Sequence, residues 1–124
     1  MSRYDRQISL PEIGTEGQAR LKAAHVLVVG AGGLGATVLP LLAGAGVGQI
    51  TLVDPDRIEE SNLHRQTLFT MQDIGRPKVA AARDHLMARN PDLALQVQET
   101  ALTADTVDRH LTEVDLVLDG ADNF

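Results

Sequence analysis

The feature that most constrains this chain is a glycine-rich turn between a short apolar run and a longer one. Val26–Val29 is apolar and β-branched at three of its four positions, which is typical of a strand buried on both faces of a parallel sheet. The turn Gly30-Ala-Gly-Gly-Leu-Gly35 follows at once, and Ala36–Ala45 has the composition of an apolar helix. The pattern G-x-G-x-x-G therefore stands in the strand–turn–helix setting that nucleotide binding requires.

The turn can bring a phosphate close to the backbone because glycine has no Cβ. Unpaired N–H groups and the dipole at a helix N-terminus also favour an anion. A second apolar strand, Ile50–Val53, ends at Asp54, where an acidic side chain can accept hydrogen bonds from ribose hydroxyls. We interpret the pattern as a nucleotide site; the structural alternative is a turn that serves only close packing of helix and sheet.

Composition limits the function further. Apolar residues make up 44% of the chain and aromatic residues only 2%, so an aliphatic core of one domain is expected. The net charge of −6 disfavours nonspecific nucleic-acid binding, and the absence of cysteine excludes a disulfide or thiolate zinc site within these residues. With neither a signal-peptide pattern nor a long apolar run, we expect a cytoplasmic location and no membrane partner.

The remaining chain is divided by proline, glycine and apolar periodicity. Residues 1–24 form an N-terminal helical arm, with a short helix predicted at Gly14–Ala23, and residues 25–124 form the core. The stretch Pro55–Met71 has no clean period and follows the carboxyl end of a strand, which indicates a functional segment. The later predicted elements are a helix that begins with Pro77 at its first position and ends at Asn90, a strand at Leu93–Val97, a helix at Thr103–Leu111 and a strand at Val114–Leu118.

This order of elements predicts the α/β class. We expect a Rossmann-like, doubly wound parallel sheet in strand order 3-2-1-4. The last strand, Val114–Leu118, is almost continuously apolar, as a strand flanked by neighbours would be. We therefore expect the sheet to continue beyond Phe124, so that the 124 residues are a truncated, N-terminal part of one nucleotide-binding domain.

Seven short motifs occur in order along the chain. They are Arg3-Tyr4-x-Arg6-Gln7, Gly30-x-Gly32-Gly33-Leu34-Gly35, Ala45-Gly46-Val47-Gly48, Asp54-x-Asp56, Ser61-Asn62-Leu63-x-Arg65-Gln66, Gly75-x-Pro77-Lys78 and Asp122-Asn123. Together they resemble the N-terminal half of the adenylation domain of the ThiF/MoeB/HesA family, which is related to ubiquitin-activating enzymes. The resemblance covers essentially all 124 residues.

The resemblance implies an adenylyltransferase. Such an enzyme uses ATP and Mg²⁺ to adenylate the C-terminal glycine carboxylate of a small ubiquitin-fold sulfur-carrier protein, of the thiamine or molybdopterin biosynthesis type, and releases pyrophosphate. This reaction concentrates negative charge at the phosphates, so it needs positioned cations and donors rather than a covalent nucleophile. The chain has no G-x-x-x-x-G-K-[ST] loop, so the cations must come from elsewhere.

The family pattern assigns roles to particular residues. It places Arg65 and Lys78 at the phosphates, Asp122 at the magnesium ion, and Arg6 in the site of a neighbouring subunit, which implies a homodimer. It places Asp54 at the ribose. The other nucleotide-binding positions that it implies are Gly30, Gly32, Gly33, Gly35, Asp56, Ser61, Asn62, Gln66 and Asn123. A zinc site, found in many members, would lie beyond the sequence considered.

Two other functions stay open at this point. A nicotinamide-dependent oxidoreductase would explain the glycine turn and Asp54 equally well, but it would not need the two cations or Asp122. A non-catalytic partner subunit would have no reason to keep that equipment intact. Each charged residue also has a structural alternative: Arg65 as a surface residue, Asp122 as a helix cap and Arg6 as part of a solvated arm.

Overall fold

The computed structural model describes residues 3–64, 66, 68–101, 103, 111 and 113–120. Four parallel strands form one sheet in the order β3-β2-β1-β4, which confirms the predicted Rossmann-like topology. The strands are β1 (His25–Val29), β2 (Gln49–Val53), β3 (Ala94–Gln98) and β4 (Leu116–Asp119). The helices are α1 (Asp5–Ile8), α2 (Gly14–Ala23), α3 (Gly33–Ala45) and α4 (Lys78–Arg89), with single 3-10 turns at Glu60–Asn62 and Met71–Asp73.

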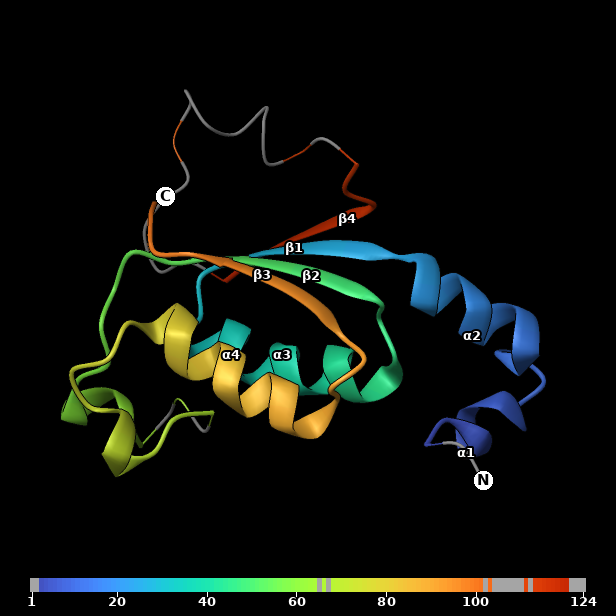
Figure 1. Cartoon of the computed structure of the whole chain (residues 1–124), viewed down its shortest axis with the longest axis horizontal. Coiled ribbons are helices and arrows are strands. Elements are labelled where there is room, and N and C mark those ends of the chain that lie inside the picture. The colour runs from blue at the N-terminus through green and yellow to red at the C-terminus, as the bar shows by residue number, and fades with distance from the viewer. Residues whose placement is uncertain are drawn as a thin grey trace.

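The elements form a layered arrangement with two distinct ends. Helices α3 and α4 lie side by side on one face of the sheet, and α1 and α2 lie beyond the amino ends of the strands (Figure 1). Leu27 is in register with Thr51 on one side and Val117 on the other, so β1 is central. Because all strands run in parallel, their carboxyl ends meet at one edge, opposite α1 and α2.

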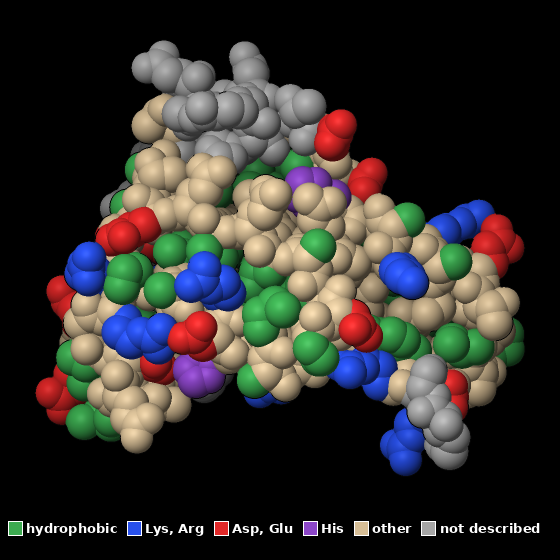
Figure 2. All heavy atoms as spheres, in the orientation of Figure 1, with side chains coloured by type: hydrophobic (Ala, Val, Ile, Leu, Met, Phe, Trp, Pro, Cys, Tyr) green, Lys and Arg blue, Asp and Glu red, His purple; other side chains and the backbone are tan. Residues whose placement is uncertain are grey.

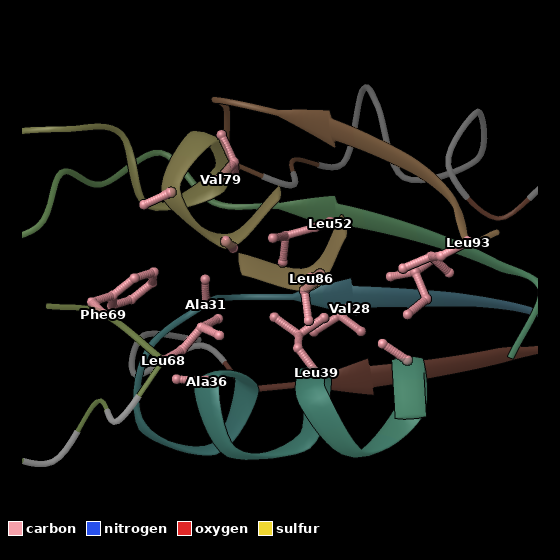
Figure 3. Packing of buried hydrophobic residues seen from close by; sticks show 14 of the residues in the cluster. Val28, Ala31, Ala36, Leu39, Leu52, Leu68, Phe69, Val79, Leu86 and Leu93 are labelled. Carbon is pink, nitrogen blue, oxygen red and sulfur yellow. The ribbon is translucent and has the colours of Figure 1, made fainter. Parts of the chain in front are cut away.

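The core is aliphatic, as composition predicts. Side chains from β1 and β2 pack against α3 and α4, with Val28, Leu39, Leu52 and Leu86 fully buried. Phe69 and its neighbour Leu68 come from the irregular segment, and Figure 3 shows both beside the start of α3. These two side chains anchor the segment to the core although it has no regular structure.

Several predicted boundaries were wrong by a few residues. Helix α3 begins at Gly33 rather than Ala36, because the carbonyl of Gly32 already accepts the N–H of Ala36 at 2.6 Å. Pro77 is the N-cap of α4 rather than its first residue, since its ψ of 135° is extended.

Strand β3 also begins one residue later than predicted, and β4 begins two residues later, at Leu116. The Asp115 carboxylate accepts the His25 N–H at 2.8 Å while the Asp115 N–H donates to the His25 carbonyl at 2.9 Å, so a side chain takes the place of one backbone acceptor there. Most of the helix predicted at 103–111 lies outside the described residues. Within the part that the structure describes, no helix is long and apolar enough to cross a membrane.

Candidate functional site

The glycine turn joins β1 to α3 at the carboxyl edge of the sheet. Gly30 has a φ of 95°, in the region that favours glycine, and its N–H donates to the Val53 carbonyl at 2.8 Å. A Cβ at Gly35 would lie 1.9 Å from the Gly30 carbonyl oxygen, so no other residue fits there. The turn is therefore closed tightly by β2, and it leaves the first N–H groups of α3 without intrahelical partners.

Asp54 ties this turn to the end of β2. Its carboxylate accepts the Ala31 N–H at 2.6 Å through Oδ2 and the Asp56 N–H at 2.7 Å through Oδ1. The side chain is buried, with 4% of its surface exposed. Asp54 thus holds the backbone of the glycine turn in place, a role that the sequence did not indicate.

The same connection continues to Lys78. The Asp56 carbonyl accepts the Lys78 N–H at 2.9 Å. Asp56 therefore links the Asp54 carboxylate to the start of α4 through its own N–H and carbonyl. Residues on either side strengthen this contact, since Ile58 and Arg76 pair through their backbones at 2.9 Å. The glycine turn and the lysine, 48 positions apart from Gly30 to Lys78 in the sequence, are fixed to each other by backbone hydrogen bonds.

Lys78 is the notable charge of this region. Only 7% of its surface is exposed, and its ammonium group has no ion pair or hydrogen bond with a described residue. Most of the Lys78 side chain is covered, while the ammonium group keeps contact with solvent, where it can meet an anion. The nearby surface does not supply a broad positive field, because acidic and basic side chains are interspersed over this face (Figure 2). The arrangement therefore favours a local anion at Lys78.

The first 3-10 turn fixes the side-chain amide of Asn62 so that its nitrogen can donate a hydrogen bond. Asn62 Oδ1 accepts the Glu59 N–H at 3.0 Å, which leaves the amide nitrogen of Asn62 free to donate. Gln66 follows on the same segment and is 1% exposed, yet its Oε1 has no hydrogen-bond partner. Such a buried acceptor requires a donor, which a ribose hydroxyl or a cationic side chain can supply.

A second polar cluster holds the segment against α4. Asp73 accepts hydrogen bonds from the Thr70 N–H at 2.8 Å, from Arg76 Nη1 at 3.0 Å and from His85 Nε2 at 2.8 Å. Burial raises the pKa of Asp73, but the hydrogen bonds from His85 and Thr70 outweigh burial and lower the pKa to about 2. Asp73 is thus ionised, and it lies five residues before Lys78. The only sequence signal for it is its position just before the Gly75-x-Pro77-Lys78 motif.

Gly120, which follows β4 and was not among the predicted site residues, lies against the glycine turn, where an added Cβ would be 3.0 Å from the Gly35 nitrogen. The other predicted residues fall into two groups. Asp56 and Ser61 are exposed on the segment that follows β2. Arg65, Asp122 and Asn123 lie outside the described residues, and among the described ones no cluster of metal-ligating side chains occurs.

Arg6 is not part of this constellation. It is exposed on α1, at the amino end of the sheet, whereas the glycine turn and Lys78 lie at the carboxyl edge (Figure 1). The structure therefore brings together the glycine turn, Asp54, Asp56 and Lys78, and keeps Arg6 away from them.

The chain is similar to named adenylyltransferases over its whole length. It is 49% identical over 124 residues to the sulfur carrier protein adenylyltransferase of Thermus thermophilus, covering 100% of this chain and 46% of that protein. It is 47% identical to the probable adenylyltransferase/sulfurtransferase MoeZ of Mycobacterium tuberculosis, covering 100% of this chain and 32% of the relative. The chain thus spans less than half the length of these curated relatives.

Solved structures agree with the fold. The Escherichia coli tRNA N6-threonylcarbamoyladenosine dehydratase TcdA in complex with ATP matches with a TM-score of 0.91 at 28% identity, over 98% of this chain and 49% of that one. Escherichia coli MccB with ATP matches with a TM-score of 0.85 at 32% identity, over 98% and 37%. The ThiF family itself matches residues 4–124. On the glycine turn, its acidic partner Asp54 and this match, the chain belongs to the ThiF family.

Proposed function

We propose that the protein adenylates the C-terminal glycine carboxylate of a small ubiquitin-like sulfur-carrier protein. The observation that carries this proposal is Lys78, a mostly covered cation without a described partner that backbone hydrogen bonds fix to the glycine turn. The names of the relatives favour adenylation over the nicotinamide-dependent alternative. The carrier belongs to thiamine or molybdopterin biosynthesis in this proposal, and ATP as the substrate suits a cytoplasmic location.

The reaction is an in-line displacement at phosphorus. A carboxylate oxygen of the carrier attacks the α-phosphorus of ATP, the α–β phosphoanhydride bond breaks, and pyrophosphate leaves with its electron pair. Lys78 and Arg65 would stabilise the growing negative charge, and the free amide N–H of Asn62 would add a neutral donor. No protein nucleophile is needed, which agrees with a chain that contains no cysteine.

The residues present suit the nucleotide. Each Asp54 oxygen accepts a single N–H, so lone pairs remain for a ribose hydroxyl, and Asp56 is exposed beside it. The unpaired Gln66 oxygen supplies one further acceptor. Asp122 follows the end of β4 and would hold Mg²⁺, whose bound form neutralises phosphate charge.

The assembly in this proposal is a homodimer. Arg6 is exposed and far from the glycine turn of its own chain, so it would complete the site of the second subunit. In this arrangement Arg6 adds a positive charge at the phosphates of the second subunit and stays exposed to solvent when the subunits are apart.

The test is ATP–pyrophosphate exchange with the full-length protein and candidate carriers. We expect exchange that depends on the carrier's C-terminal glycine and on Mg²⁺. Calorimetric titration should show binding of ATP with Mg²⁺ in preference to NAD. Tight binding of NAD without a response to ATP would overturn the proposal, and ATP binding without exchange for any carrier would favour a non-catalytic partner subunit.

A further inference from the structure

The N-terminal arm is attached to the core by a small set of side-chain amides. Helix α1 has only four residues, and none of them is buried. A cavity of about 670 Å³ lies beside it, lined among others by Tyr4, Ile8 and Leu93. Because no α1 residue is buried, polar contacts are the main described link between this helix and the core.

The amides bind the carboxyl end of α3. The last carbonyls of a helix have no intrahelical partner, and here two of them are used. The Ala45 carbonyl accepts Gln7 Nε2 at 2.8 Å and Gln18 Nε2 at 3.1 Å, and these two side chains also bond to each other at 2.5 Å. Gln7 belongs to α1 and Gln18 to α2, so one carbonyl fixes both helices to the core.

A third amide completes this arrangement. Asn90 is 2% exposed, and its Nδ2 donates to the Ala43 carbonyl at 2.9 Å and to the Tyr4 hydroxyl at 2.8 Å. Position 46 has to be glycine for these contacts to form, because a Cβ there would lie 2.4 Å from Gln18 Nε2 and 2.9 Å from Tyr4 Cε1. We call Gln7, Gln18 and Asn90 the arm clamp.

We infer that the arm clamp holds Arg6 in the orientation that a second copy of this chain requires. Arg6 lies next to Gln7 on α1 and is exposed, so fixing Gln7 also fixes the direction in which Arg6 leaves the surface. This inference rests on the proposed function, in which Arg6 completes the neighbouring site. The clamp residues are positioning residues, since they touch neither nucleotide nor carrier.

Mixed dimers test the inference. Gln7→Met and Gln18→Met remove the amides at nearly constant size, and we expect each to lower exchange about tenfold or more in the full-length protein, because small misplacements of a catalytic group have effects of that order. Each is then mixed with Lys78→Met, whose site is inactive but whose arm is intact. We expect recovery of about one quarter of wild-type activity, since half of randomly mixed dimers contain one complete site.

Recovery separates positioning from damage. A clamp variant that has lost its own site or its fold cannot be rescued by a second subunit, so a lack of recovery would overturn the inference, as would full activity of the clamp variants alone. Arg6→Ala mixed with Lys78→Met tests the proposed dimeric site separately. If this mixture recovers activity and the clamp mixtures do not, only the clamp fails. If no mixture recovers activity, the proposed role of Arg6 in the second subunit's site is wrong, and the inference about the clamp falls with it.

Two glycines provide a matched control. Gly46→Ala should displace Gln18 and Tyr4 and behave like the clamp variants, including recovery in mixed dimers. Gly44→Ala makes the same chemical change two positions earlier, where an added Cβ meets nothing within 4 Å, and it should leave exchange unchanged. Equal activity of the two variants would contradict the clamp.

Discussion

At the residue scale, Lys78 is a positive charge without a structural partner among the described residues. The residue as a whole is 7% exposed, and its ammonium group forms no ion pair or hydrogen bond with a described residue. A cation without a structural partner fits a binding role better than a structural one. Asp54 is the opposite case, because two backbone N–H groups satisfy its charge.

We predict that Lys78→Met lowers adenylation and does not lower stability. Exchange should fall by about 10²–10³, the usual effect of losing one preorganised charge at a transition state. The melting temperature should stay close to that of the wild type, since Met replaces the covered aliphatic part of the side chain and no ion pair with a described residue is lost. Arg83→Met, an exposed position on the same helix, is the control and should change neither quantity. Normal exchange in Lys78→Met would show that the phosphate site lies elsewhere.

Asp73 gives a prediction about pH. Its pKa is lowered to about 2 in the folded protein from 3.8, so its stabilising effect is complete above about pH 4 and is lost as the pH falls toward 2. We therefore expect Asp73→Asn to lower the unfolding free energy by about 2 kcal/mol at pH 7, with a shrinking difference below pH 4.

Urea unfolding at a series of pH values measures this difference. Asp84→Asn is the matched control, because Asp84 contacts the same Arg76 but its side chain is 56% exposed. Its effect should stay below about 0.5 kcal/mol. A loss in Asp73→Asn that does not change with pH would mean that the ionisation of Asp73 does not contribute to stability.

At the scale of elements, the start of α3 has the least tolerance for change. We predict that Gly35→Ala destabilises the protein by about 2 kcal/mol or more and abolishes ATP binding, because its Cβ would lie 1.9 Å from the Gly30 oxygen. Gly44→Ala on the same helix should be neutral or stabilising by about 0.5–1 kcal/mol. Thermal melting with and without ATP distinguishes them, and similar melting of both variants would contradict the tight turn.

The irregular segment between β2 and α4 behaves as an element of its own. It is held at its start by the Asp54–Asp56–Lys78 connection, in its middle by Phe69 in the core, and at its end by Asp73. This explains how a stretch without periodicity can hold a fixed conformation. Its order comes from contacts with distant parts of the chain rather than from local propensity.

At the scale of the whole molecule, the outer strand β4 exposes apolar side chains. In β4, Leu116 is 51% and Val117 is 40% exposed, on opposite faces of the strand. Such an apolar edge favours association with another strand. The curated relatives are more than twice as long as the matched region, which is consistent with a further neighbour for β4.

We predict that residues 1–124 expressed alone associate and do not catalyse exchange. Val117→Lys should reduce this association, because an edge lysine opposes strand pairing. In the full-length protein the same substitution should instead lower the melting temperature, since the strand would be covered there. Light scattering and thermal melting measure both effects. A monomeric, cooperatively folding and active wild-type piece would overturn the prediction.

The sequence by itself determined the strand order, the glycine turn and the approximate position of most elements. These follow from local physics: runs of Val and Leu form buried strands, and only glycine fits at Gly30 and Gly35. The prediction for Gly14–Ala23 was confirmed to the residue. The family motifs also singled out Lys78 before any contact was known.

Only the tertiary structure decided how these residues support one another. Three sets of contacts join residues that lie 11 to 86 positions apart in the sequence. They are the contact of Asp54 with the glycine turn, the Asp73 cluster and the arm clamp. Polar side chains in such contacts follow no period of 2 or 3.6, so sequence patterns do not reveal their partners. Their pairing depends on which backbone groups the folded sheet leaves unsatisfied, and this is a property of the packed chain.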